Sequence, residues 1–246
     1  MIYNPFSLNG KTILITGASS GIGRSVAIEC SKLGAKLIIT GRNEARLKET
    51  LNLLTGSDHH FISVDLSDSS NIDTLIYNLS ELDGVVHCAG ISKRLPLKFI
   101  KEQSLTELHK INFIAPVILT QKLYKNKFLK PEASLVYISS VAHAYASIGS
   151  IMYMSSKGAL NSFVKGLALE ISVMNIRANA ILPGMISTDL SPVLSDEDKS
   201  KDFANYPLGR YGKPEEVAWA AIYLLSDATK WMTGSLLTLD GGLTLR

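Results

Sequence analysis

The sequence predicts an α/β protein: a doubly wound parallel sheet of about seven strands flanked by helices, in one domain over residues 1–246. Short apolar runs alternate with amphipathic stretches along the whole chain. The runs are nearly continuous in apolar character, as expected for parallel strands covered on both faces by helices. A chain of 246 residues with 46% hydrophobic residues can also bury a large core.

Each element follows from the local pattern. The expected strands are residues 11–16, 36–40, 61–64, 84–88, 134–138, 177–182 and 236–239. The expected helices are residues 21–33, 43–54, 68–79, 104–124, 151–173 and 214–225. Gly34 ends the first helix, Pro116 is expected to bend the fourth, and Pro214 opens the last. Right-handed crossovers between such strands place a ligand crevice at their carboxyl ends.

The longest stretch without clear periodicity is residues 185–213. We interpret it as a lid over the crevice rather than as a boundary between domains, because long loops inside a compact domain are usually functional. Its part from Ser187 to Tyr206 is polar, which disfavours a large apolar pocket. His143, Tyr145 and Tyr206 are candidates for the lining of the site.

Composition excludes several classes of protein. The net charge is +3 (25 Lys and Arg against 22 Asp and Glu), and no nucleic-acid-binding motif is present, so nucleic acid is not an expected partner. Cys30 and Cys88 form neither a metal-ligand spacing nor a disulfide framework, so we expect a reducing, cytoplasmic setting and no metal site. We find no signal peptide, and no apolar run approaches the ~18 residues of a membrane span, so no membrane partner is expected.

A glycine-rich turn, TGASSGIG at residues 16–23, lies between the first strand and the first helix. Glycines are needed where a phosphate-binding turn is tight, where its backbone approaches the pyrophosphate and where the helix packs on the strand. This context favours a Rossmann-like dinucleotide site over an ordinary turn, and the absence of Gly-Lys-Ser/Thr argues against a P-loop. The cofactor-binding candidates here are Gly17, Ser19, Ser20, Gly21, Ile22 and Gly23.

Arg42 is the candidate that would select the cofactor. Gly41 stands at the end of the second strand, where an acidic residue usually binds the ribose 2′-hydroxyl, and Arg42 follows it. An arginine can bind a 2′-phosphate through charge-assisted hydrogen bonds. The sequence therefore favours NADP, whereas NAD remains the expectation if Arg42 is only a solvated residue at the start of a helix.

Tyr153 and Lys157 lie four residues apart on an expected helix and share a face. A free tyrosine has a pKa of ~10, and a neighbouring ammonium would favour its phenolate form. Ser140, at the end of an expected strand, could donate a hydrogen bond to a substrate or cap the turn. Asn112, inside the fourth helix, could bend that helix, hold a water or be solvated.

Taken together, these motifs resemble the short-chain dehydrogenase/reductase family, in its compact branch of about 250 residues. The resemblance covers essentially the whole chain in order. The matching segments are TGASSGIG, VDLSD with Asp65 and Leu66, INFIAP with Asn112, YISSVA with Ser140, YMSSK with Tyr153 and Lys157, ILPGMISTDL with Pro183 and Gly184, and the closing PLGRYGKPEEVAWAAIYLLSD and TGSLLTLDGG.

The resemblance implies hydride transfer between a nicotinamide and a carbonyl or alcohol carbon. Tyr153 would be the general acid/base, and Lys157 would lower its pKa and bind the nicotinamide ribose. Ser140 would orient the carbonyl, and Asn112 would hold a water in a proton relay. Further cofactor contacts are implied for the segments that match around Asp65, Leu66, Cys88, Ala89, Gly90, Pro183, Gly184, Ile186 and Thr188.

One motif departs from the family pattern. Asn-Asn-Ala-Gly usually follows the fourth strand, whereas this chain has His87, Cys88, Ala89 and Gly90. Ala89 and Gly90 keep the close backbone approach, but the two amide side chains are missing. We expect His87 to be a structural histidine and Cys88 a small buried residue, with a reactive thiol beside the cofactor as the alternative.

The sequence leaves the substrate open, beyond a small molecule with a carbonyl or alcohol group. A basic run of Lys122, Lys125, Lys127 and Lys130 could bind an acyl carrier protein, as in a 3-oxoacyl thioester reductase, or could be a solvated charged face. A dinucleotide sensor without catalysis is a different class of function, as is an epimerase or dehydratase. The resemblance also implies a homo-oligomer, a tetramer or dimer, formed through the helices at 104–124 and 151–173.

Overall fold

The computed structural model describes residues 3–189 and 195–245. It contains a parallel sheet in the order β3-β2-β1-β4-β5-β6-β7, in which every paired strand runs parallel to its neighbour. The strands are β1 (Thr12–Thr16), β2 (Lys36–Gly41), β3 (His60–Ser63), β4 (Leu82–His87), β5 (Leu129–Ile138), β6 (Arg177–Pro183) and β7 (Leu236–Leu239). The predicted doubly wound α/β fold is confirmed.

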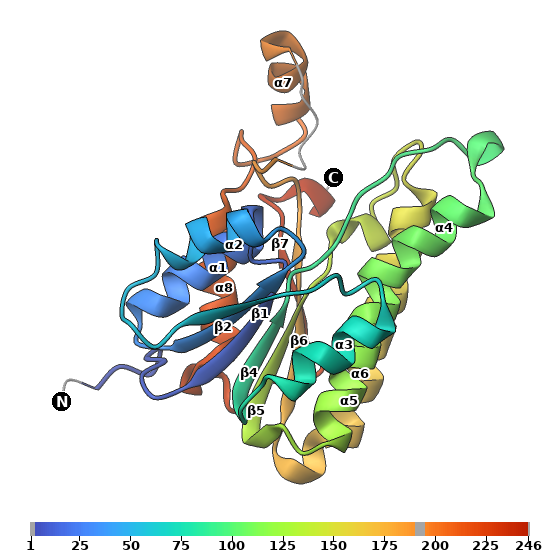
Figure 1. Ribbon diagram of the computed structural model, residues 1–246. Helices are drawn as coiled ribbons and strands as arrows, with labels where there is room; N and C mark the ends of the chain where they lie inside the picture. The colour runs from blue at the N-terminus through green and yellow to red at the C-terminus, as the bar shows by residue number, and fades with distance from the viewer. Residues whose placement is uncertain (1–2, 190–194, 246) are drawn as a thin grey trace.

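Helices cover both faces of the sheet (Figure 1). One face carries α1 (Gly21–Lys32), α2 (Glu44–Leu51) and α8 (Pro214–Leu225). The other carries α3 (Ser69–Tyr77), α4 (Glu102–His109), α5 (Ala115–Lys125) and α6 (Ile151–Ile171). Successive strand residues alternate between the two layers: Leu14 packs into one, and Ile13 and Ile15 into the other, all fully buried. Both faces of the strands therefore need apolar side chains, which explains their continuous apolar runs.

The fourth expected helix, which was expected to bend near Pro116, is interrupted by a π turn just before this proline. A π-helical turn, η2 (Lys110–Ile114), separates α4 from α5, and Pro116 falls in the first turn of α5. Proline has no N–H and its ring clashes with the carbonyl four residues earlier, here that of Asn112. The extra residue of a π turn relieves this conflict, and such turns are frequent at functional sites.

The segment expected to be an irregular lid contains a helix, α7 (Asp196–Phe203). Ser195 begins it by accepting a hydrogen bond from the backbone N–H of Asp198 at 3.1 Å. The helix has no apolar stripe because it projects away from the core (Figure 1), and so periodicity could not reveal it. Residues 190–194 of the expected lid lie outside the described residues.

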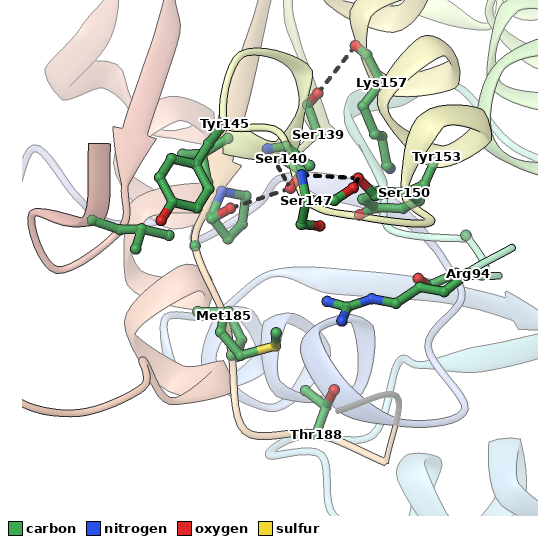
Figure 2. Close-up of a pocket in the computed structure, with 18 of the residues that line it drawn as sticks. Arg94, Ser139, Ser140, Tyr145, Ser147, Ser150, Tyr153, Lys157, Met185 and Thr188 are labelled. Atoms are coloured by element: carbon green, nitrogen blue, oxygen red, sulfur yellow. Dashed lines mark hydrogen bonds between the residues drawn. The ribbon is translucent and has the colours of Figure 1, made fainter. Parts of the chain in front are cut away.

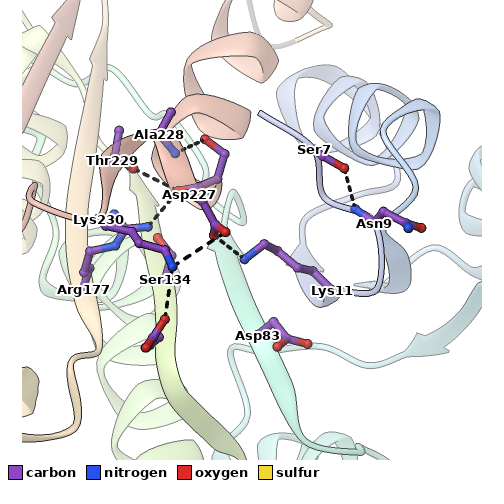
Figure 3. Close-up of polar contacts among 12 residues, drawn as sticks. Ser7, Asn9, Lys11, Asp83, Ser134, Arg177, Asp227, Ala228, Thr229 and Lys230 are labelled. Carbon is purple, nitrogen blue, oxygen red and sulfur yellow. Dashed lines mark hydrogen bonds and ion pairs between the residues drawn. The ribbon is translucent and has the colours of Figure 1, made fainter. Parts of the chain in front are cut away.

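A polar network fixes the amino ends of the central strands, at the opposite edge from the predicted site (Figure 3). Ser134 Oγ and Arg177 Nη2 donate to the Leu224 carbonyl at the end of α8, at 2.7 and 2.8 Å. Lys11 pairs with Asp227 at 2.9 Å and so lowers the pKa of that carboxyl group. These bonds anchor α8 and the start of β6, which leaves the other edge of the sheet free for chemistry.

Candidate active site

The glycine turn brings two backbones closer together than side chains would permit. A Cβ on Gly17, whose φ is +66°, would lie 2.8 Å from the backbone of Ala89. A Cβ on Gly23 would lie 2.3 Å from the carbonyl oxygen of Gly17. These two glycines therefore allow the turn to close on the end of β4 and the helix α1 to start directly against the turn.

Two residues that the sequence analysis did not single out hold this turn in place. The buried Thr16 Oγ1 accepts hydrogen bonds from the backbone N–H groups of Cys88 and Ala89, both at 3.1 Å. Arg24 donates to the Ser19 carbonyl at 2.8 Å and to Thr50 Oγ1 at 3.0 Å. Thr16 lies inside the turn motif, and Arg24 follows the motif directly. Their position next to the glycines is the sequence feature that could have identified them as residues that support the turn.

The start of α1 meets the requirements of a dinucleotide. Ser20 is the N-cap residue, and its side chain makes no capping hydrogen bond. A Cβ on Gly21 would lie 3.4 Å from the side chain of Thr188, so the lid segment reaches the turn. Backbone N–H groups at a helix start attract phosphate, and the bare glycine backbone lets a pyrophosphate approach. The structure thus fits the cofactor that this motif implies.

The residues expected on the adenosine side have different surroundings. Arg42 is exposed directly after β2, whose last residue, Gly41, packs beside Ser19. Asp65 uses one carboxylate oxygen to accept a hydrogen bond from the Ser67 N–H at 2.9 Å. Leu66 is buried in the core. Arg42 is therefore free to turn toward a ligand, whereas the Asp65 carboxylate partly serves its own turn.

Ser140, Tyr153 and Lys157 line one cavity of about 790 Å³ at the carboxyl edge of the sheet (Figure 2). The cavity is also lined by Cys88, Gly90, Pro183, Gly184, Ile186 and Thr188, and by Ile22 of the glycine turn. The structure thus brings together residues from five separate segments that the sequence analysis singled out. Ser140 Oγ also accepts a hydrogen bond from the Ala142 N–H at 3.1 Å, so it caps the following turn as well.

Burial dominates the acid–base properties of this cluster. Loss of water raises the pKa of the Tyr153 phenol, and the hydrogen bond with Ser140 acts in the opposite direction. Burial lowers the pKa of Lys157 to about 8. Lys157 Nζ lies 5.7 Å from the centre of the Tyr153 ring and donates to the Ile138 carbonyl at 2.8 Å. The lowering of the Tyr153 pKa by Lys157, which the resemblance implied, stays a prediction.

Asn112 is a structural clamp in this geometry. Its Oδ1 accepts from the Ile91 N–H at 2.8 Å and its Nδ2 donates to the Ile91 carbonyl at 2.9 Å. Nδ2 also lies 3.2 Å from Ser156 Oγ on α6. Being only 1% exposed, Asn112 is not a solvated residue. Its side chain joins the π turn, the loop after β4 and the helix that carries Lys157.

His87 is buried, whereas Cys88 is half-buried and lines the cavity. The His87 ring stacks on Tyr137, with ring centres 4.5 Å apart, and its Nε2 lies 3.2 Å from Thr120 Oγ1. Burial lowers the pKa of His87 to about 3, so the ring is neutral at physiological pH. Burial raises the pKa of the Cys88 thiol to about 12, which disfavours the reactive thiolate. Burial of His87 is in line with the structural role expected for it, whereas the half-buried position of Cys88 differs from the buried position expected.

Residues of the segment expected to be a lid line another side of the cavity. Ser187 N–H donates to the Gly212 carbonyl at 2.9 Å, and Gly212 N–H donates to the Met185 carbonyl at 3.0 Å, so the two ends of the segment are joined. Tyr145 and Tyr206 line the cavity, as expected, whereas His143 is not among the lining residues and its Nδ1 lies 3.1 Å from the Ser140 carbonyl. The lid is thus attached at its base to the body of the protein.

The basic run is only partly available to a partner. Lys122 pairs with Asp73, and Lys130 pairs with Asp83 at 2.8 Å. Lys125 and Lys127 are exposed. Intramolecular ion pairs therefore account for half of the run.

In the part of the chain that the structure describes, no helix is both long enough and apolar enough to cross a membrane.

Comparisons with known proteins agree with this geometry. A family profile described as enoyl-(acyl carrier protein) reductase matches residues 17–244. The chain is 36% identical to the 3-oxoacyl-[acyl-carrier-protein] reductase FabG of Rickettsia prowazekii over 239 residues, which are 97% of this chain and 98% of that protein. It is 33% identical to the FabG protein of Aquifex aeolicus over 243 residues, with 96% and 98% covered.

Solved structures are similar along their whole length. A structure from Agrobacterium tumefaciens, described as a 2-deoxy-D-gluconate 3-dehydrogenase with bound NADP, has a TM-score of 0.90 and 29% identity, covering 99% of this chain and 100% of that one. A second structure from the same organism, described as a gluconate dehydrogenase, has a TM-score of 0.90 and 27% identity, with 98% of each chain covered.

Proposed function

The chain belongs to the short-chain dehydrogenase/reductase family and is an oxidoreductase of carbonyl and hydroxyl groups; on this premise we propose that it reduces a carbonyl compound with NADPH. The observation that carries the proposal is the cavity that Ser140, Tyr153 and Lys157 line together, directly beside the glycine turn. A protein that only sensed a dinucleotide would not need this set of side chains.

When bound, the nicotinamide supplies the hydride that reaches the carbonyl carbon. In our proposal Tyr153 donates its phenolic proton to the carbonyl oxygen, and Ser140 donates a hydrogen bond to the same oxygen. A raised pKa keeps the Tyr153 phenol protonated at neutral pH, which suits an acid in the reductive direction. Lys157, held near the tyrosine ring, would stabilise the phenolate that remains and bind the ribose hydroxyls.

Asn112 would support the return of a proton to Tyr153. Its side chain is occupied by Ile91 and Ser156, so any water in a relay would have to use its backbone carbonyl. Pro116 has no N–H to donate to this carbonyl, which supports the proposal. Asn112 would thus act in two ways, as a clamp through its amide and as a water ligand through its backbone.

The preference for NADP rests on Arg42. Its exposed side chain follows β2 beside the turn that would hold the pyrophosphate, and the cation can form charge-assisted hydrogen bonds with a 2′-phosphate. Such a contact contributes about 1.5–3 kcal/mol, which corresponds to a roughly ten- to a hundredfold preference. The relative with bound NADP is in accord with this assignment.

The decisive experiment is a fluorescence titration with NADPH and NADH, followed by a screen of ketones. We expect tighter binding of NADPH, lost on Arg42→Ala but kept in the control Lys48→Ala on the following helix, α2. Tyr153→Phe should lower kcat by about 10²–10⁴-fold and leave NADPH binding nearly unchanged. Equal turnover by Tyr153→Phe would exclude the assigned acid, and binding without any turnover would favour a sensor.

A 3-oxoacyl thioester on a carrier protein is the second candidate substrate. The chain is 36% identical in sequence, over 239 aligned residues, to a relative described as a 3-oxoacyl-[acyl-carrier-protein] reductase. Lys125 and Lys127 would be its docking residues. Charge reversal of both should raise the KM for a carrier-bound thioester and leave the KM for the same acyl group on a small thiol unchanged. No effect on the carrier-bound substrate would remove the carrier protein as a partner.

A further inference from the structure

Arg94 lies on the loop after β4, and its side chain lines the same cavity as Ser140 and Tyr153. Figure 2 shows it extending into the cavity toward Met185 and Thr188 of the lid segment. Its backbone position is fixed, because Leu95 N–H donates to the Gly149 carbonyl at 2.9 Å. Gly149 has a φ of +82°, and a Cβ there would lie 3.6 Å from the Arg94 Cβ. The loop therefore packs directly on the segment that leads into Tyr153.

The neighbouring cation shows that this direction is specific to Arg94. Lys93 turns away from the cavity onto α4, where it donates to Ser104 Oγ at 2.9 Å and lies 3.9 Å from Glu107. Within residues 3–189 and 195–245, by contrast, the Arg94 guanidinium has no ion-pair partner. Two adjacent cations thus have opposite roles: one is tied to a helix, and the other faces the site.

The other charged groups that line the cavity come from the lid helix α7 and are already engaged. Asp202 accepts hydrogen bonds from the Tyr211 hydroxyl and from Asn205 Nδ2, and Asp198 accepts one from Ser195 Oγ at 2.7 Å. Lys201 pairs with Glu197 at 2.7 Å. Among the charged residues described around the cavity outside the catalytic cluster, Arg94 is thus the cation left to meet a ligand.

We propose that Arg94 is a specificity-determining residue that binds an anionic group of the substrate, a carboxylate or a phosphate, while Ser140 and Tyr153 hold its carbonyl oxygen. A guanidinium offers either group two parallel hydrogen bonds. The inference rests on the proposed carbonyl reduction and narrows its substrate to a compound that carries both a carbonyl and an acidic group.

The test compares matched substrates in matched variants. A series of short 2-oxo and 3-oxo acids is offered with NADPH, each beside its neutral methyl ester, to the wild type, Arg94→Gln, Arg94→Lys and the control Lys93→Gln. We expect the wild type to prefer the acids. Arg94→Gln should lower the acid-to-ester ratio of kcat/KM by roughly ten- to a hundredfold, mainly through KM. Arg94→Lys should restore part of the ratio, and Lys93→Gln should keep it.

The source of the anion needs a second pair of substrates. An acetoacetyl group is offered on pantetheine and on 4′-phosphopantetheine, which differ in one phosphate. If Arg94→Gln lowers the kcat/KM for the phosphopantetheine thioester relative to that for the pantetheine thioester, Arg94 binds the phosphate of a carrier arm. If Arg94→Gln lowers only the acid-to-ester ratio of kcat/KM, Arg94 binds the carboxylate of a small molecule.

Two results would overturn the proposal. One is an equal loss of kcat/KM for acids and esters in Arg94→Gln, which indicates a structural role. The other is a raised Kd for NADPH in that variant, which assigns Arg94 to the cofactor. If no ketone is reduced, the proposed function itself fails. Equilibrium dialysis of the same acids with the NADP-loaded protein then tests whether Arg94 binds their anionic group. Binding that is weakened by Arg94→Gln but not by Lys93→Gln would retain the anion site, and equal binding would reject it.

Discussion

At the scale of single residues, His87 shows how burial changes the chemistry of a side chain. The ring lies between Tyr137 and Thr120, and its Nδ1 has no hydrogen-bond partner among the described residues. Burial of the charged form is therefore unfavourable, and the pKa falls to about 3. The histidine serves as a neutral, flat ring in the core, in a position where the family usually has an amide.

His87 should make the protein sensitive to acid. The unfolded chain binds a proton at this residue below about pH 6.5, whereas the folded chain does not until about pH 3, so stability is lost as the pH falls through this interval. By pH 4.5 the loss is about 3 kcal/mol. Denaturant unfolding measures the free energy of unfolding at pH 7.5 and 4.5. Between these two pH values it should fall less in His87→Gln than in the wild type, by about this amount.

The control is His109→Gln, which removes a histidine from α4 and leaves the surroundings of His87 intact. If His87→Gln and the wild type lost the same free energy of unfolding between the two pH values, His87 would not be the residue that resists protonation. Other groups, such as paired carboxylates, would then account for the acid sensitivity.

At the scale of elements, side-chain hydrogen bonds of the neighbouring helices α1 and α2 hold the glycine turn in shape. Arg24 on α1 reaches the Ser19 carbonyl in the turn, and Thr50 and Glu49 on α2, at 2.8 to 3.0 Å. Thr50 in turn donates to the Ala18 carbonyl at 2.9 Å. The turn is thus positioned by the packing of α1 against α2 as well as by its glycines.

Arg24→Met should therefore weaken cofactor binding without touching the catalytic cluster. We expect a loss of about 1–3 kcal/mol in the free energy of unfolding, because the hydrogen bonds of a charged group are lost, and a raised Kd for both NADPH and NADH. Lys48→Gln, which removes a cation from the outer face of α2, should change stability by less than about 0.5 kcal/mol. A selective effect on NADPH alone would instead indicate that Arg24 contacts the 2′-phosphate.

The helix α7 is a second element, and it is joined to the segment that follows it. Asp202 at the end of α7 accepts a hydrogen bond from the buried Tyr211, and Phe203 and Tyr206 pack against the Tyr211 ring with centres 4.8 and 5.5 Å apart. The Tyr211 side chain thus joins the helix to the segment that follows it. The remainder of α7 is polar and projects from the body.

Tyr211→Phe should loosen α7 while the core stays intact. Removal of the hydroxyl leaves Asp202 without this donor, so we expect faster hydrogen exchange in peptides from residues 196–206 and a raised substrate KM. The control Tyr223→Phe removes a hydroxyl from α8, outside the lid. Unchanged exchange in α7 would mean that ring packing, rather than the hydrogen bond, holds the helix.

At the scale of the whole molecule, the helical layer formed by α4, α5 and α6 keeps apolar side chains on its outer surface. Leu105, Ile114, Ile151, Leu169 and Val173 are each between 38% and 81% exposed. The chain's own core does not use these side chains. The resemblance to the family implies that a second copy covers them, so this surface is expected to be an interface.

Light scattering of the purified protein should therefore give a mass at least twice that of one chain of 26.7 kDa. Leu169→Lys places a charge on the expected interface and should shift the mass toward that of a monomer. Leu53→Lys, on the opposite helical layer, also replaces an exposed leucine and should have no effect. A wild-type monomer would contradict the expectation.

The sequence alone determined the fold class, the positions of the seven strands and the glycine-rich turn, because each depends on a local pattern: apolar runs of strand length and glycines at fixed spacing. It also predicted Ser140, Tyr153 and Lys157 as catalytic residues. It also predicted structural roles for His87 and Cys88. The tertiary structure alone decided the rest. The clamp of Asn112 on Ile91 and the direction of Arg94 each depend on contacts between segments far apart in the chain, and the helix α7 has no apolar stripe that periodicity could detect. Periodicity reports which face of an element is buried, and it carries no information about what that element meets.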